Sequence, residues 1–433
     1  MGGNEPSKGV ANSTAEPSAS LLPGLAPPQR HGLPNGAELV SLSLPGAPLV
    51  CVDFWCRAGS VFERDAESGM AHFLEHMVFK GSARLGAGEF DRRIEALGGN
   101  SNAATGFDDV HYHVLIPPAA AAEAVDLLLD LVLRPRLEPE AFAMERQVVL
   151  EELAQSEDQP EEVAVQTLLA RACPDHPYGL PILGRRERLL AHAPDAMADF
   201  HRRLYGAGRC ELALSGAVDD ALLEQVAAGA LGQLEAVAEP EPLPPLRLVS
   251  GEHQLALPRL EAARLLMAWW QPPAADLAGV MGADLATSLL AEGRRSRLVE
   301  RLREQLRLVE SIDLDLHPME CGSLALLEAV CEEADLPEVR RAIEQVWQEV
   351  MEEPAGEAEW ARARRLVANN YRFGLESPSA VAGLIGNSHL WGRRQSLSAP
   401  LRELERWSPR RLQEEALQRL DPAQAYVLQA VPA

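Results

Sequence analysis

The sequence predicts an α+β protein of two homologous domains, each a mainly antiparallel sheet with helices packed on one face. Two observations lead to this fold class. The chain has 433 residues, and a single hydrophobic core stops growing at roughly 250–300 residues, so two domains are expected. The secondary-structure patterns also follow one order twice, namely two strands, two helices, two strands and further helices, on either side of a proline-rich segment.

The first domain is expected at residues 31–235, after a Ser-, Pro-, Gly- and Ala-rich tail at residues 1–30 that should be flexible. Alternating or β-branched apolar runs predict strands at 37–44, 48–56, 109–116 and 209–214. Helical periodicity predicts helices at 69–79, 89–97, 119–133, 139–154 and 219–231. The pair Gly98-Gly99 ends the second of these helices.

The second domain is expected at residues 249–433, beyond the run AVAEPEPLPPLRL at residues 236–248, whose prolines are typical of a linker. Its strands are predicted at 255–258, 263–271, 308–316, 323–330 and 425–430. Its helices are predicted at 279–290, at 296–305 and in several segments between 337 and 420. The repeated order indicates a duplicated domain.

Charge limits the classes of partner. The chain has 40 Lys and Arg against 64 Asp and Glu, a formal net charge of −24. Nucleic acids and anionic membranes are polyanions, so we expect neither as a partner. A basic or neutral peptide is compatible with this charge, and so is simple solubility. No stretch approaches the ~20 apolar residues of a membrane span.

The cysteines and the amino-terminal segment predict a cytoplasmic protein. The six cysteines are scattered and none forms a CxxC motif, so they do not suggest a disulfide framework. Most have apolar neighbours and are expected to be buried, reduced thiols. The amino-terminal segment has no basic run followed by an apolar core, so no secretory signal is expected.

The segment HFLEH, from His72 to His76, has the spacing of a metal site. Residues four apart on a helix project from the same side, so the two imidazoles can bind one metal ion. Glu75 borders the same site and can take a proton from water, whose pKa zinc lowers from ~15.7 to about 7. HxxEH is the inverted form of the HExxH zinc motif. The alternative is a partly exposed helix face with two ordinary histidines.

A catalytic zinc ion usually has three protein ligands, so a carboxylate from a later helix is expected. The helix within MERQVVLEEL carries Glu145 and Glu152, which are seven residues apart and share one face. One of these acids can bind the metal while the other supports a ligand. The alternative is a solvated acidic face, which is our interpretation of Glu151.

Four segments together resemble the pitrilysin family of inverzincin metallopeptidases, especially its short, mitochondrial-processing-peptidase-like branch. They are HFLEHMVFKGS from His72, GGNSNAATGFDDVHYHVLIP from Gly98, ERQVVLEEL from Glu145 and HPYGLPILG from His176. The similarity extends over residues 33–430. It implies one zinc ion per chain, held by His72, His76 and Glu152. It also implies Glu75 as the catalytic base and Glu145 as its supporting acid, with Glu151 as the alternative third ligand.

The resemblance also implies a groove in which an edge strand pairs with an extended peptide. In this chain the strand would include Asn102, Ala103 and Ala104. Main-chain pairing holds a peptide largely regardless of its side chains. The preceding residues, 98–100, are expected to form a turn with no role beyond geometry.

The second half contains no HxxEH. At the corresponding place it has GADLAT from Gly282, and the following EGRRSRL from Glu292 resembles the family's turn into its next helix. Family members of this length often pair with a second chain, so a homodimer or a heterodimer with a related subunit is implied. Zinc-site members also use an Arg-Tyr pair from the other half or the partner. Arg364 and Tyr371 have suitable types but fall in a predicted helix rather than a strand.

Other candidates have simpler interpretations. His111 and His113 share one face of a strand and could bind metal, although we interpret them as ordinary sheet residues. His176 is expected in a loop, and Trp269 and Trp270 in the core or between domains.

The sequence thus predicts a zinc-dependent metalloendopeptidase that hydrolyses extended peptides or presequence-like segments. The alternative is a non-catalytic structural or partner subunit of a peptidase-like heterodimer.

Overall fold

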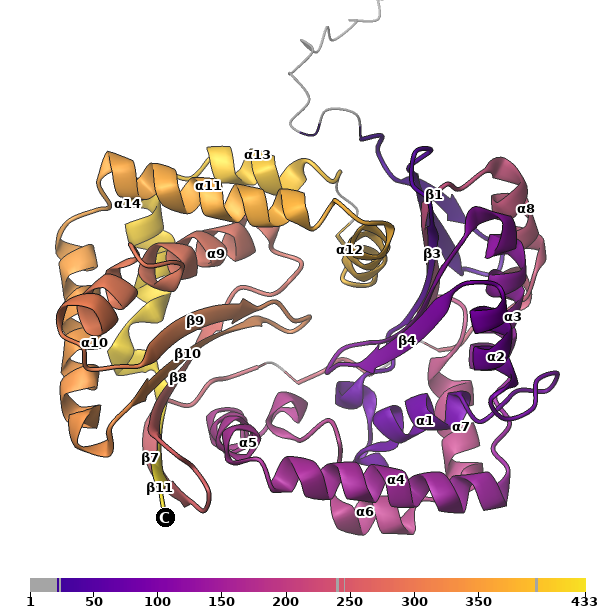
Figure 1. The fold of residues 1–433 in the computed structure, drawn as a ribbon, viewed down its shortest axis with the longest axis horizontal. Coiled ribbons are helices and arrows are strands. Elements are labelled where there is room, and N and C mark those ends of the chain that lie inside the picture. Colours follow the sequence, from indigo (N-terminus) through magenta and orange to yellow (C-terminus); the bar gives the residue numbers. More distant parts are fainter. Residues whose placement is uncertain (1–21, 23–24, 239–240, 245, 394–395) are drawn as a thin grey trace, which may run out of the picture.

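The computed structural model describes residues 22, 25–238, 241–244, 246–393 and 396–433. Two sheets, one in each half of the chain, face each other with helices around the outside (Figure 1). Most of the tail expected at residues 1–30, and three residues of the expected linker, lie outside the described residues. Gln29 and Arg30 correct the tail boundary, because they pair with Ser41 and Val40 as part of the first strand.

The first sheet has the strand order β1-β2-β6-β3-β5-β4. Its strands are β1 (Gln29–Gly32), β2 (Glu38–Ser43), β3 (Val50–Cys56), β4 (Asn100–Thr105), β5 (Val110–Ile116) and β6 (Cys210–Gly216). The consecutive strands β2 and β3 are not neighbours, because β6 lies between them. The strand β4 forms an edge of the sheet, and its sequence NSNAAT lacks the apolar pattern that identified β2, β3, β5 and β6.

Helices from the first half cover one face of this sheet. They are α1 (Met70–Val78), α2 (Glu89–Ala96), α3 (Ala121–Leu133), α4 (Pro139–Glu157), α6 (Arg186–Ala191), α7 (Pro194–Leu204) and α8 (Asp220–Ala228). A further helix of this half, α5 (Pro160–Ala172), packs on the second sheet instead. Phe54 of β3, Phe73 of α1 and Tyr112 of β5 are fully buried in the core between sheet and helices. Burial of these apolar side chains sets the position of α1 against the sheet.

The second half repeats this topology. Its strands are β7 (Gly251–Leu257), β8 (Ala263–Gln271), β9 (Ser311–His317), β10 (Ser323–Cys331) and β11 (Tyr426–Pro432). Its helices include α9 (Leu277–Ala291), the π-helical segment Val299–Gln305, α10 (Leu336–Glu352), α11 (Glu357–Phe373), α12 (Pro378–Leu390), α13 (Ala399–Glu405) and α14 (Pro409–Arg411). The order β7-β11-β8-β10-β9 matches β2-β6-β3-β5-β4 of the first half.

The pairing directions match as well. Among the described strands, β2 with β6 and β7 with β11 are the parallel pairs, and every other neighbouring pair is antiparallel. The predicted α+β class with two similar, mainly antiparallel halves is therefore confirmed.

One helix from each half packs on the sheet of the other half, an arrangement that the sequence did not predict. The helix α5 packs on β7, β8 and β11, where Leu168 lies among Leu266 and Leu428. The helix α12 packs on β2, β3 and β6, where Val381 and Ile385 meet the second face of the first sheet. This exchange explains why β3 is buried along its whole length, because its two faces are both covered. Helices therefore lie on both faces of each sheet rather than on one.

The hairpin between β9 and β10 contacts the first half directly. The Asp108 carboxylate accepts hydrogen bonds from the Tyr178 hydroxyl at 2.6 Å and from the Glu320 backbone N–H at 2.8 Å. The Tyr178 oxygen in turn accepts from the Cys321 N–H at 3.1 Å, and Glu320 forms an ion pair with Arg57. Burial raises the pKa of Asp108 to about 6. The contact joins the segments GFDD and HPYG to the second half.

Trp269 lies in a hydrophobic core and Trp270 lies between the two halves, the two environments expected for these residues. Trp269 is buried in the core of the second half and donates a hydrogen bond to the Asp421 carbonyl at 2.8 Å. Trp270 packs against the core of the first half. Its ring also lies on Gly322, where any side chain would overlap it.

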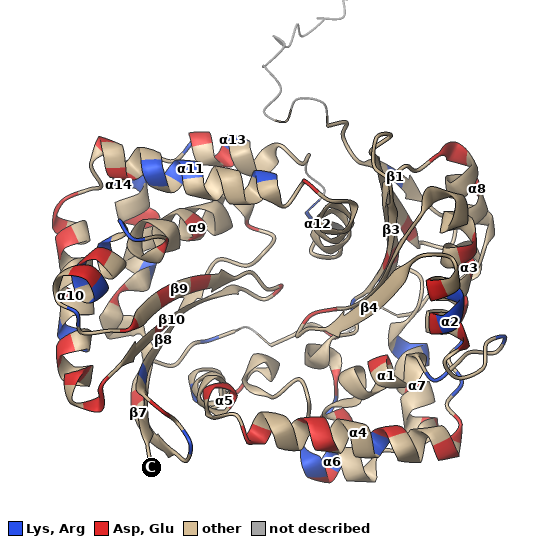
Figure 2. Ribbon diagram, viewed as in Figure 1, with Lys and Arg blue, Asp and Glu red and all other residues tan. Residues whose placement is uncertain are grey.

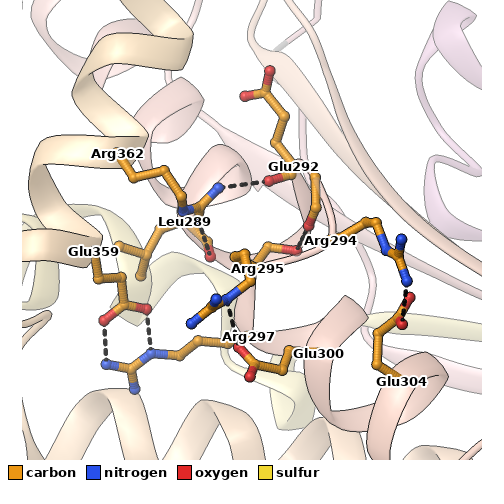
Figure 3. A network of polar contacts seen from close by, with 11 residues as sticks. Leu289, Glu292, Arg294, Arg295, Arg297, Glu300, Glu304, Glu359 and Arg362 are labelled. Carbon is orange, nitrogen blue, oxygen red and sulfur yellow. Dashed lines mark hydrogen bonds and ion pairs between the residues drawn. The ribbon is translucent and has the colours of Figure 1, made fainter.

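Arginines join the end of α9 to its neighbours (Figure 3). Arg362 of α11 donates to the carbonyls of Glu292 at 2.7 Å and Leu289 at 3.4 Å, which lie at the carboxyl end of α9. Arg297 forms two hydrogen bonds with Glu359, at 2.7 and 2.9 Å. Helix ends leave carbonyls without intrahelical partners, so these contacts stabilise the turn. The segment EGRRSRL thus has a structural role.

Charged residues are spread over both halves. Figure 2 shows Asp and Glu on helices such as α4 and α10, whereas β3 and β4 are largely uncharged. None of the described helices is both long and apolar enough to cross a membrane.

Candidate metal centre

The helix α1 carries the HxxEH residues and is fixed at its amino-terminal end. The Glu63 carboxylate accepts hydrogen bonds from the backbone N–H groups of Gly69 at 2.9 Å and Ala71 at 2.8 Å. A carboxylate at this position satisfies free N–H groups and interacts favourably with the helix dipole. Gly69 has a φ of 82° and lies so close to Gly184 that a Cβ on Gly184 would be 2.4 Å from the Gly69 Cα atom. The final glycine of HPYGLPILG therefore helps to place α1.

His72, His76 and Glu152 come together between α1 and α4. The distance between His72 Nε2 and Glu152 Oε1 is 3.6 Å, and that between His76 Nε2 and Glu152 Oε2 is 3.3 Å. The two imidazole rings are 4.7 Å apart, edge to face. Ligand atoms of all three side chains lie within 4.8 Å of one another. Two imidazole nitrogens and a carboxylate are the donors of many zinc sites, so the residues fit this metal.

The electrostatics of His72 favour a neutral ring. Its side chain is buried, and burial together with the neighbouring His76 lowers the pKa of His72 to about 4. A neutral imidazole keeps the lone pair that metal binding requires.

Glu145 lies behind His76 rather than among the ligand atoms. Its Oε1 atom is 2.9 Å from Nδ1 of His76, and its Oε2 atom is 2.7 Å from Nζ of Lys80. Glu145 is buried, so its carboxylate fixes the ring orientation of His76. Lys80 balances the charge of this buried carboxylate.

Glu75 faces the end of β4. Its Oε2 atom accepts a hydrogen bond from the Thr105 hydroxyl. Burial raises the pKa of Glu75, while the Thr105 hydrogen bond and the neighbouring His76 oppose that shift. Glu151, in contrast, is exposed and is not part of the cluster.

The three residues proposed to contact substrate lie on the edge strand β4. Asn102 and Ala104 are exposed, and Ala103 is half-buried. The Ala103 N–H donates to the Asn102 side-chain oxygen at 2.9 Å. Gly98, with a φ of 80°, and Gly99, whose Cβ would be 2.9 Å from the Leu115 carbonyl, form a turn before this strand. Asn100, which was also expected in the turn, is instead the first residue of β4.

The remaining candidates lie elsewhere. His176 is in a loop, where its Nδ1 accepts from the Tyr178 N–H at 3.2 Å. Arg364 and Tyr371 lie on α11 in the second half, where the Tyr371 hydroxyl donates to the Leu397 carbonyl at 2.6 Å. His111 and His113 lie on β5, where they share one face of the sheet with Asp53 of β3.

Sequence reasoning missed three supporting residues. Lys80 follows His76 by four residues, so helical spacing could have identified it. Thr105 and Glu63 gave no comparable signal, because their roles depend on how β4 and the segment before α1 approach the site.

Two family models match the chain. Residues 38–186 match the model described as Insulinase (Peptidase family M16), and residues 193–367 match the model described as Peptidase M16 inactive domain. The first range contains His72, Glu75, His76 and Glu152. The second contains α9, which carries no histidine.

Curated relatives include several zinc proteases. An uncharacterized zinc protease of Mycobacterium tuberculosis is 30% identical over 401 residues, which cover 91% of this chain and 90% of the relative. An uncharacterized zinc protease of Streptomyces coelicolor is 26% identical, with 89% and 86% covered. A probable mitochondrial-processing peptidase subunit beta of Arabidopsis thaliana is 34% identical over 195 residues, which cover 45% of this chain and 37% of the relative.

Solved structures share the fold. A protease from Helicobacter pylori superposes with a TM-score of 0.86 at 23% identity, covering 94% of this chain and all (100%) of the other. A structure titled as a peptidase M16 inactive domain, from Pseudomonas fluorescens, has a TM-score of 0.84 at 19% identity, with 94% and 98% covered. The family resemblance in the four sequence segments is thereby confirmed. The chain belongs to the insulinase family of peptidases, family M16.

Proposed function

We propose that this protein is a zinc-dependent metalloendopeptidase that hydrolyses extended peptides or presequence-like segments. The observation that carries the proposal is the approach of both Nε2 atoms, of His72 and His76, to within 3.6 Å of the Glu152 carboxylate. This donor set leaves a coordination position open, as catalytic zinc sites require. The relatives named as zinc proteases support the same metal.

Bound zinc would lower the pKa of water and polarise a peptide carbonyl. The protein's own part in the reaction falls mainly to Glu75. Its carboxylate takes the proton from the attacking water and then transfers that proton to the nitrogen of the leaving amine. Its raised pKa suits both transfers, and the hydrogen bond from Thr105 orients the carboxylate.

Glu145 and Lys80 act as positioning residues. Glu145 accepts a hydrogen bond from Nδ1–H of His76, which leaves Nε2 of that ring free to bind metal. Lys80 forms an ion pair with the second Glu145 oxygen at 2.7 Å and so balances the charge of this buried carboxylate.

Substrate is proposed to add to β4 as a further strand, with Asn102, Ala103 and Ala104 in contact. Three facts support this: β4 is an edge of its sheet, its Thr105 touches Glu75, and an edge strand offers unpaired main-chain groups. The Ala103 N–H is already paired with the Asn102 side chain, so a peptide carbonyl would displace that side chain.

We propose that the active form is a dimer, either of this chain or with a related subunit. Figure 1 shows α11, which carries Arg364 and Tyr371, on the opposite side of the molecule from α1, where it packs on α9 and α13. These two residues are therefore not placed to serve α1 as an Arg-Tyr pair. A partner would then supply that pair. Light scattering on the purified chain, alone and with candidate subunits, tests this proposal.

The function is tested by comparing wild type with Glu75→Gln on an unstructured peptide, before and after chelation. We expect chelator-sensitive cleavage by the wild type and a loss of ~10²–10⁴-fold in kcat for Glu75→Gln with zinc still bound. Zinc binding without cleavage, alone and with a partner, would instead favour a non-catalytic subunit.

A further inference from the structure

A second group of metal-binding side chains lies on the first sheet. Asp53, His111 and His113 each offer a ligand atom within 4.8 Å of the others. In the part of the chain that the structure describes, this group and the one formed by His72, His76 and Glu152 are the two sets of this kind.

Strand geometry brings the three residues together. His111 and His113 are two apart on β5, so both point to the same face of the sheet. Asp53 of β3 pairs directly with His113 across the antiparallel ladder, which places its side chain on that face too. The opposite face carries Phe54 and Tyr112, which belong to the core around α1.

The polar groups of this set are incompletely satisfied by protein. Asp53 is only 2% exposed, and its Oδ1 atom is 3.0 Å from Nδ1 of His111. Nδ1 of His113 is buried and has no hydrogen-bond partner among the described residues. Buried polar nitrogens are normally paired, so a cation bound by Nδ1 of His113 and its neighbours would account for the arrangement.

The rings are held in place before any ion arrives. His111 stacks on Trp55 with centroids 4.2 Å apart and planes 13° apart. The His111 and His113 rings are nearly parallel, with centroids 5.5 Å apart. The His111 side chain is 23% exposed, so an ion can reach the site from solvent. Rigid donors lose little entropy when they bind an ion.

We propose that Asp53, His111 and His113 bind a second divalent transition-metal ion. Two imidazoles and one carboxylate favour zinc and the neighbouring first-row metals, whereas calcium and magnesium prefer oxygen ligands alone. The site is separate from His72 and His76, because its side chains lie on the other face of the sheet.

The site is close to the proposed substrate strand. His111 pairs with Ala104 and His113 pairs with Asn102, so the ion would lie one strand from the edge on the face of those residues. It would join β3 to β5 and so stiffen the sheet against which a peptide is held.

Metal counting on the full-length chain, free of affinity tags, tests the proposal. The protein is stripped with chelator, loaded with Co²⁺ as the probe, and measured by elemental analysis and visible absorption. Wild type is expected to bind two equivalents, and His76→Ala and His113→Ala one each. His317→Ala is the control, because His317 is exposed on β9 outside either cluster, and it should still bind two.

Asp53→Asn provides a second test with nearly the same shape as the native side chain, and circular dichroism of the chelated variants checks folding. We expect Asp53→Asn also to bind one equivalent and to lose part of the rise in Tm that Co²⁺ gives the wild type. Binding that is unchanged in both His113→Ala and Asp53→Asn would overturn the proposal and leave Asp53 and His111 as an ion pair.

Discussion

The helices α1 and α9 occupy equivalent places in the two halves but carry different chemistry. Each follows the third strand of the shared five-strand order, β3 for α1 and β8 for α9. Each also packs beside a long helix, α4 for α1 and α11 for α9. On α1, His72 and His76 face Glu152 of α4. On α9, Gly282 leaves room for Trp407, whose ring would overlap any Cβ at that position.

The long helices differ in the same way. The helix α4 presents Glu145 and Glu152 to α1, whereas α11 presents Arg362 to the carbonyls at the end of α9 (Figure 3). Acids paired with imidazoles provide the donor atoms of the candidate metal centre, and an arginine paired with carbonyls makes a helix cap. The duplicated fold therefore contains two equivalent helix pairs, α1 with α4 and α9 with α11, and the side chains on each pair determine whether it has the donor atoms for a metal.

The largest effect is expected from removal of a ligand in the first half. His76→Ala should reduce peptide cleavage to the level of the chelated wild type, because two ligands hold zinc poorly. Asp284→Asn, at the equivalent helix of the second half, should leave cleavage unchanged. A steady-state assay measures peptide cleavage by both variants. Equal losses of cleavage would contradict the proposal that only the first half carries the catalytic site.

A smaller loss is expected from the positioning acid. Glu145→Gln should lower metal affinity or activity by about 10–100-fold, because His76 loses the partner that orients its ring. Glu151→Gln, one residue before Glu152 and exposed, is the matched control and should behave as wild type. Titration with a zinc indicator measures the affinity. A strong effect of Glu151→Gln would indicate that Glu151, and not Glu152, is the third metal ligand.

Gly184 and Gly293 have similar backbone conformations but differ in how closely other atoms pack around them, so replacing each by alanine compares the packing in the two halves. Gly184 (φ 82°) touches Gly69 beneath α1, whereas Gly293 (φ 78°), after α9, has open space around its Cα. Gly293→Ala should cost about 1–2 kcal/mol from its backbone alone, and Gly184→Ala about 3 kcal/mol or more because of the added overlap. Urea denaturation measures both, and equal costs would mean that the contact with Gly69 is not needed to hold α1.

Asp284 of α9 should make the second half sensitive to pH. Burial raises the pKa of Asp284 to about 7, above its ordinary value of 3.8, and Glu292 adds to the shift. Between these values the folded chain holds a proton that the unfolded chain releases, so stability rises as pH falls through this window.

Asp284→Asn should therefore be more stable than wild type at pH 8, by ~1–3 kcal/mol, with the difference shrinking towards pH 4. Tm measured across this range tests the expectation. A constant difference would show that Asp284 titrates as it does in the unfolded chain.

Much of the fold and of the site was predictable from local pattern. The spacing of His72, Glu75 and His76, and of Glu145 and Glu152, is a property of single helices and is visible in the sequence. The edge strand β4 was predicted through the family resemblance, because its local pattern carries no strand signal. The exchange of the helices α5 and α12 was not predictable, because their places depend on contacts between distant segments. Trp55 against Gly386 is one such contact, 331 positions apart in the sequence. Thr105 and Glu63 also contact the site only because separate segments of the chain pack together, Thr105 against Glu75 and Glu63 against the start of α1.

The most direct test of the asymmetry is to locate zinc in crystals of the zinc-loaded chain by anomalous scattering at the zinc absorption edge. We expect a peak within bonding distance of Nε2 of His72, Nε2 of His76 and a Glu152 oxygen, and none beside α9. Absence of the peak between α1 and α4, or a peak at Asp284 instead, would contradict this expectation.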